Sequence, residues 1–139
     1  MKHLISFLII ILLATSCKKT FDHPESCDDY DYYDCETIEP EVGKATFRFT
    51  INDKVWNVPF VIYKGSVEDN NVLFIDTARA ESIVQYDLYF GTYSVKAKYV
   101  VDGKTIYVVD GGEMEKWSND VCDSVCWSWD ELDLDLRIK

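Results

Sequence analysis

Cysteine is the residue type in this sequence with the widest choice of chemistry. The chain has five cysteines, and the four that follow Cys17 are Cys27, Cys35, Cys122 and Cys126. An even set of this kind predicts disulfides if the chain is exported. A bond between Cys122 and Cys126 needs only a turn, so local pairing is the arrangement we expect there. Crossed pairing through much longer loops stays open, because native geometry decides between the two.

The spacing of these cysteines does not suit metal or redox chemistry. Seven residues separate Cys27 from Cys35, and three separate Cys122 from Cys126. Zinc knuckles commonly place two residues between their cysteines, and thiol redox centres use a Cys-x-x-Cys motif, which this chain lacks. The sequence therefore predicts no metal site and no cofactor, with a four-thiolate zinc site as the alternative.

Histidine is scarce, and this limits the enzyme classes that the chain could belong to. Both histidines lie within the first 23 residues, before the expected domain. A serine or cysteine nucleophile activated by histidine is therefore excluded from that domain. Asp110 with Glu113, or Asp130 with Glu131, could be glycosidase acids, but 25 acids among 139 residues form such pairs by chance. We expect no enzyme. A carboxylate-dependent hydrolase would require two acids that face into a concave pocket.

The tryptophans have two interpretations. Trp127 and Trp129 are two residues apart and would share one side of a strand, so that with Trp117 they could stack on sugar rings as an aromatic platform. In the other interpretation, Trp56 and at least one of these three fill the core, which is what we expect. Exposed, coplanar rings would favour carbohydrate binding.

The N-terminus has the layout of a secretory signal. Lys2 precedes an apolar run over residues 4–14, which is 11 residues long and too short to span a bilayer. The stretch Leu12-Leu13-Ala14-Thr15-Ser16-Cys17 resembles a bacterial lipoprotein lipobox, in which the cysteine is acylated and becomes the first residue. We expect a lipoprotein signal peptide over residues 1–16 and lipidation of Cys17. An ordinary signal peptide with an incidental cysteine is the alternative.

The expected lipid anchor predicts a location for the protein. Acyl chains on one cysteine hold a domain on a membrane durably. The cysteine is followed by Lys18 and Lys19 rather than by an aspartate, and this favours the outer membrane as the location. The periplasmic face and the cell surface both stay open.

An acidic tether is expected over residues 17–44. Nine acids and no Lys or Arg occur between Asp22 and Glu41, and Pro24 and Pro40 interrupt regular structure. A calcium loop over residues 28–34 is disfavoured because it lacks the glycine of the sharp turn. The net charge of −11 excludes nucleic acid as a partner.

Residues 45–139 have the pattern of short strands. Phe47, Phe49 and Ile51 alternate with polar residues, as do the leucines of residues 132–136. Asp102-Gly103 is typical of a two-residue hairpin turn and would pair Val101 with Lys104. The expected fold is all-β, an antiparallel β-sandwich of six to eight strands, immunoglobulin-like or transthyretin-like. A small barrel is the alternative.

Several stretches of this region carry a family resemblance. Residues 49–56, 61–65, 76–77 and 91–99 resemble small lipoproteins of the Bacteroidota with an immunoglobulin-like or transthyretin-like (carboxypeptidase regulatory or PEGA-like) sandwich. The resemblance implies a scaffold and carries no catalytic residue, since family members mostly have unknown function or serve as accessory and adhesion modules. We therefore expect a non-enzymatic envelope lipoprotein that binds an envelope protein. A carbohydrate-binding module is the alternative.

Overall fold

The computed structural model describes Cys27, residues 35–80 and residues 82–139. The chain divides into two units, Met1–Asp31 and Tyr32–Lys139, and Cys27 is the one described residue of the first. The expected signal peptide, the lipidation site Cys17 and most of the acidic tether lie outside the described residues. Within the described part of the chain, no helix is long and apolar enough to cross a membrane.

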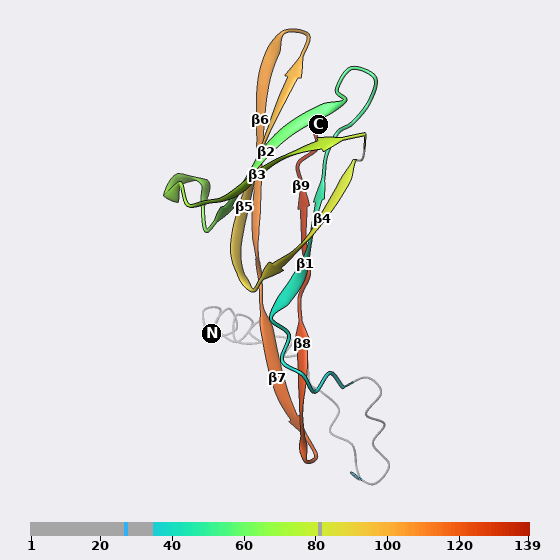
Figure 1. The fold of residues 1–139 in the computed structure, drawn as a ribbon, viewed down its shortest axis with the longest axis vertical. Helices are drawn as coiled ribbons and strands as arrows, with labels where there is room; N and C mark the ends of the chain where they lie inside the picture. Colours follow the sequence, from blue (N-terminus) through green and yellow to red (C-terminus); the bar gives the residue numbers. More distant parts are fainter. Residues whose placement is uncertain (1–26, 28–34, 81) are drawn as a thin grey trace, which may run out of the picture. The chain divides into compact units, whose positions relative to one another are not determined.

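The second unit is built from strands, and the expected all-β class is confirmed (Figure 1). Its described strands form a three-stranded sheet in the order β4-β1-β9, a four-stranded sheet in the order β3-β2-β5-β6 and a two-stranded sheet, β7-β8. The strand pairings are antiparallel, except that β1 pairs with β9 in parallel. The elements are β1 (Val42–Arg48), β2 (Asn57–Lys64), the 3-10 helix η3 (Val67–Asp69), β3 (Val72–Arg79), β4 (Ile83–Tyr89), β5 (Gly91–Val101), β6 (Lys104–Met114), β7 (Lys116–Val121), β8 (Ser124–Trp129) and β9 (Leu132–Asp135).

The nine strands of the described residues exceed the expected six to eight, and one turn that the sequence suggests is part of a strand instead. The sequence around Gly111 and Gly112 suggests a turn, but β6 runs through it to Met114. A Cβ on Gly111 would lie 3.0 Å from the Tyr93 carbonyl oxygen, and one on Gly112 would lie 2.8 Å from Leu132 Cδ1. These glycines therefore permit close packing inside a strand, and the turn expected there is wrong.

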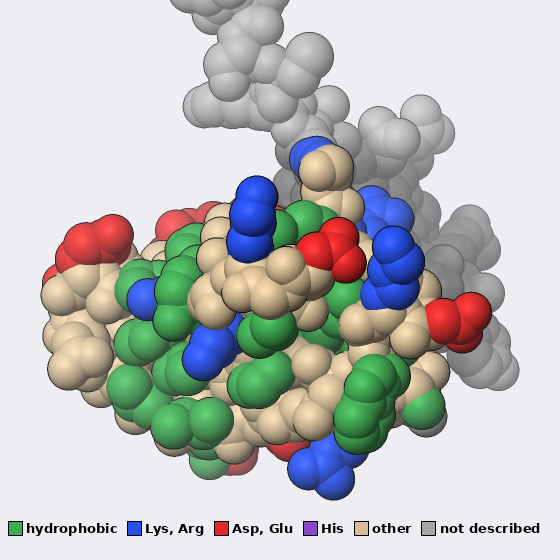
Figure 2. Space-filling model, turned by 90° about the horizontal axis from the view of Figure 1, so that it is seen from above, with side chains coloured by type: hydrophobic (Ala, Val, Ile, Leu, Met, Phe, Trp, Pro, Cys, Tyr) green, Lys and Arg blue, Asp and Glu red, His purple; other side chains and the backbone are tan. Residues whose placement is uncertain are grey.

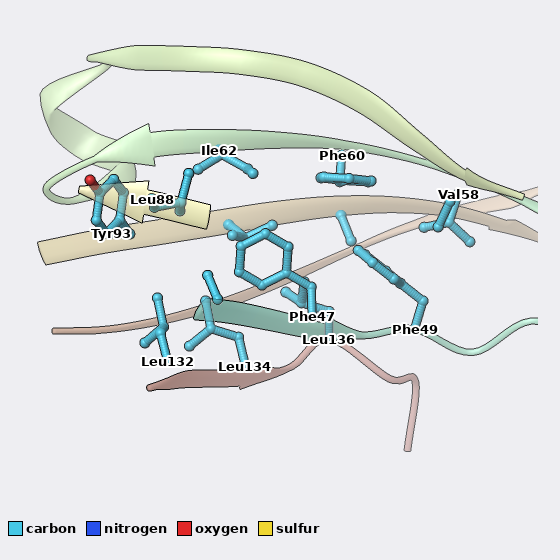
Figure 3. Packing of buried hydrophobic residues seen from close by; sticks show 14 of the residues in the cluster. Phe47, Phe49, Val58, Phe60, Ile62, Leu88, Tyr93, Leu132, Leu134 and Leu136 are labelled. Atoms are coloured by element: carbon cyan, nitrogen blue, oxygen red, sulfur yellow. The ribbon is translucent and has the colours of Figure 1, made fainter. Parts of the chain in front are cut away.

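The larger two sheets form a sandwich around one apolar core (Figure 3). Phe47 of β1 and Leu134 of β9 come from the three-stranded sheet, while Phe60 and Ile62 of β2 come from the four-stranded sheet. The Phe49 and Phe60 rings meet across the sandwich with centroids 4.9 Å apart. Alternating side chains that are apolar on one side of each strand produce this core.

Local turn chemistry sets the register of the β5–β6 hairpin as expected. Asp102 and Gly103 take positive φ angles of 48° and 75°, and Val101 pairs with Lys104. Tyr99, opposite Ile106, is fully buried. Its hydroxyl donates a hydrogen bond to the Leu136 carbonyl oxygen at 2.6 Å and so fixes the end of the chain to this hairpin.

The tryptophans are absent from the buried core cluster of the described residues, so the expectation that they fill it is wrong. Trp56 is 69% exposed. Asn52 and Val55 form a tight turn in which the Asn52 side chain accepts hydrogen bonds from the Lys54 and Val55 amides. This turn changes the phase of alternation, so that Val55 and Val58 are buried and Trp56 points away.

Candidate functional site

One disulfide connects distant parts of the second unit. Cys35 bonds to Cys126 across a sequence separation of 91, and their Cα atoms lie 5.0 Å apart. Cys27 and Cys122 each take part in a disulfide as well. The expected local bond between Cys122 and Cys126 is therefore wrong. Cys122 lies at the β7–β8 turn with a φ of 55°, whereas Cys126 lies within β8 opposite Asn119, so the hairpin register separates the two.

The described end of the expected tether lies along this hairpin. The Trp127 amide donates a hydrogen bond to the Glu36 carbonyl oxygen at 2.8 Å. Lys116 Nζ forms an ion pair with Glu39 Oε1 at 2.7 Å and donates a hydrogen bond to the Pro40 carbonyl oxygen at 2.8 Å. Together with the disulfide at Cys35, these bonds attach residues 35–40 to β7 and β8.

The three tryptophans of the hairpin lie on both of its sides. Trp127 and Trp129 alternate with Ser128 and share one side of β8, and Trp117 pairs with Ser128 and so lies on the other side. Trp129 is 38% exposed, while Trp127 is half-buried with Lys116 Nζ 5.6 Å from its ring centroid. The hairpin therefore brings two of the three expected platform residues to one surface.

A shallow hollow of about 240 Å³ lies on the outer face of the β3-β2-β5-β6 sheet. Strand register explains its shape: Val61 is paired with Ile75 of β3 on one side and with Lys96 of β5 on the other. The short side chains of Pro59 and Val61 form a floor between longer ones. The lining residues are Pro59, Phe60, Val61, Tyr63, Ile75, Lys96, Lys98 and Tyr107.

The outer face of this sheet combines apolar and cationic side chains. Ile75 is 69% exposed, Tyr107 56% and Val109 53%. Lys96 Nζ lies 4.6 Å from the centroid of the Tyr107 ring, a cation–π contact. Figure 2, seen from the end where the β5–β6 turn lies, shows Lys and Arg side chains set between hydrophobic ones at that end.

This face, with Lys96 and Lys98 on the outer side of β5, was not identified as a candidate site from the sequence. The sequence pattern that could have identified this face lies in β6, where the residues from Thr105 to Val109 are uncharged on both sides of the strand. A strand with a solvated face usually alternates apolar with polar residues. An outer face that breaks this alternation is typical of a contact surface.

A second hollow of about 320 Å³ lies at the edges of β3 and β4. Its lining contains one carboxylate, that of Asp87, and neither of the acid pairs considered for a hydrolase lines either hollow. Asp110 instead accepts a hydrogen bond from the Asp135 amide at 2.8 Å. Within the described residues, no group of three or more His, Cys, Asp or Glu side chains is arranged to hold a metal ion.

The same two strand edges are joined by a polar contact that depends on pH. The Tyr86 hydroxyl of β4 donates a hydrogen bond to Asp76 of β3, and the rings of Tyr86 and Phe74 pack with centroids 4.8 Å apart. This hydroxyl, followed by the Thr77 amide, lowers the pKa of Asp76 below its usual value. Burial and the Asp76 contact raise the pKa of Tyr86.

We expect this contact to make a small, acid-sensitive contribution to stability. Because the pKa of Asp76 is lowered in the folded state, the contribution is present above the ordinary aspartate pKa and is lost as pH falls through the lowered value. The unfolding free energy should therefore fall less on acidification in Asp76→Asn than in the unsubstituted protein. The difference should be less than about 1 kcal/mol, because Asp76 is exposed. Urea unfolding at neutral and acidic pH measures this, with Asp102→Asn as the control. Equal acid losses in Asp76→Asn and the unsubstituted protein would contradict it.

Comparison with protein-family models, curated proteins and solved structures found no match to this chain.

Proposed function

We propose that this protein is a non-enzymatic envelope lipoprotein that binds a partner protein through the outer face of its β3-β2-β5-β6 sheet. The exposure of Ile75, Tyr107 and Val109 around one hollow carries the proposal. Clustered apolar side chains that face solvent mark interaction surfaces, and tyrosine is enriched at such surfaces. The sandwich behind them holds these side chains on rigid strands.

The proposed attachment is a lipid on Cys17 after removal of residues 1–16, which would place the domain at the outer membrane. Its support is the short apolar run and the lipobox-like stretch that ends at Cys17. The disulfides fit an exported protein, because exported compartments favour their formation. Lipid attachment would keep the binding face close to envelope partners without a spanning helix.

Site-specific photo-cross-linking in intact cells tests the binding face. We expect p-benzoylphenylalanine at position 107 to form a discrete covalent adduct with another protein, because Tyr107 is exposed at the edge of the hollow. The same residue at position 44, an exposed site on β1 of the other sheet, is the matched control. Adducts at both positions alike, or at neither, would contradict the proposed function.

A further inference from the structure

Within the described residues, Lys96 and Lys98 form no ion pair with a carboxylate, although the chain as a whole is acidic. They lie two residues apart on the outer side of β5. Their cross-strand partners on this face, Val61, Val109 and Tyr107, are uncharged. The ion pairs within the described residues involve other cations, namely Arg48, Lys116 and Arg137. The chain as a whole carries a net charge of −11, so the positive charge of this face is opposite in sign to the net charge of the protein.

The charge of this face indicates what it can bind. Two neighbouring ammonium groups favour a ligand with carboxylates and disfavour a symmetric contact with the same face of a second copy, where lysines would meet lysines. The Lys96 ammonium lies over the Tyr107 ring, at the side of the hollow and above the apolar floor made by Pro59 and Val61. A ligand would therefore place an apolar group on the floor and its negative charges beside the lysines.

The size and surroundings of the hollow favour a protein segment over a small molecule. Its volume of about 240 Å³ is below the usual range for pockets that enclose small ligands. It is large enough for one side chain of a partner, the usual anchor of a protein interface. Exposed Val109, which pairs with Lys96 but does not line the hollow, extends the apolar surface beyond it, where the rest of a segment could lie.

We propose that this hollow binds an acidic segment of the partner protein, with one apolar side chain on Pro59 and Val61 and flanking carboxylates on Lys96 and Lys98. The inference rests on the proposed function and specifies the partner's chemistry. Two exposed ion pairs of this kind contribute roughly a factor of ten in affinity together. Their contribution should weaken as salt is added, because exposed charges are screened.

A matched pair of synthetic peptides tests the proposal with the 15N-labelled protein in NMR titrations. One is the capped heptapeptide Glu-Leu-Glu-Phe-Glu-Leu-Glu, and the other has Gln in place of every Glu. We expect the acidic peptide to shift the amide signals of Lys96, Lys98 and Tyr107 and to bind about tenfold more tightly than the Gln peptide. The advantage should disappear in the double variant Lys96→Gln/Lys98→Gln and persist in Lys44→Gln/Lys54→Gln, which removes the same charge elsewhere.

The outcomes separate this inference from the proposed function. Equal binding of both peptides at these residues would leave a contact surface but overturn the recognition of acids. No shift at these residues, or an equal loss of binding in both double variants, would also overturn it. Concentration-dependent shifts of the same signals without peptide would identify a second copy as the occupant and overturn it as well. Failure of the proposed function would appear independently, as the absence of an adduct specific to position 107.

Discussion

A variant in which Cys27, Cys35, Cys122 and Cys126 are all serine is expected to lose at least about 4 kcal/mol of unfolding free energy. The bond between Cys35 and Cys126 alone closes a loop with a sequence separation of 91. In the chain-entropy estimate, closing a loop of that length stabilises the folded state by over about 4 kcal/mol, because the unfolded chain loses conformational freedom. Cys27 and Cys122 are replaced as well because a remaining disulfide would still restrict the unfolded chain.

Chemical denaturation of this variant measures the loss, and the unsubstituted protein under reducing conditions is the control. Both should unfold at the same denaturant concentration, well below that of the oxidised protein. Hydrogen exchange at the Trp127 amide adds a local measurement, because that amide donates to the Glu36 carbonyl oxygen beside the disulfide. Exchange there should become faster in the variant. A loss of less than about 1 kcal/mol would show that the cross-link does not stabilise the sandwich in this way.

Features set by neighbouring residues could be predicted from the sequence. Asp102-Gly103 specifies its turn through positive φ angles, and the turn fixes the pairing of Val101 with Lys104. The leucines at 132, 134 and 136 are buried because strand alternation places them on one side. In each case the information lies within a few residues of the feature.

Features set by contacts between distant residues could not be predicted. Gly112 reads as a turn residue until Leu132 is seen against it, and the partner of Cys126 depends on where residue 35 lies. Alternation likewise shows that Lys96 points outward but not whether a further layer covers it. The candidate site is a property of the assembled sheet, so its residues could be named from the sequence but their grouping could not.

Phe47→Ala is expected to lower the unfolding free energy by about 3 to 5 kcal/mol, the usual range for deleting a buried phenylalanine ring. Phe47 is fully buried on β1, which is paired with β4 on one side and β9 on the other. Its ring contacts Phe60 of the facing sheet at a centroid distance of 6.3 Å and Tyr86 at 5.8 Å. A strand fixed on both sides cannot easily move inward, so the cavity should remain largely open.

Tyr89→Ala is the matched control for this prediction, because it removes an aromatic ring of similar size that is 67% exposed at the end of β4. It should change the unfolding free energy by no more than about 0.5 kcal/mol. If Phe47→Ala does not fold, Phe47→Leu retains part of the volume and should show a smaller but measurable loss. Similar losses at positions 47 and 89 would contradict a core centred between the two sheets, since removing an exposed ring leaves no buried cavity.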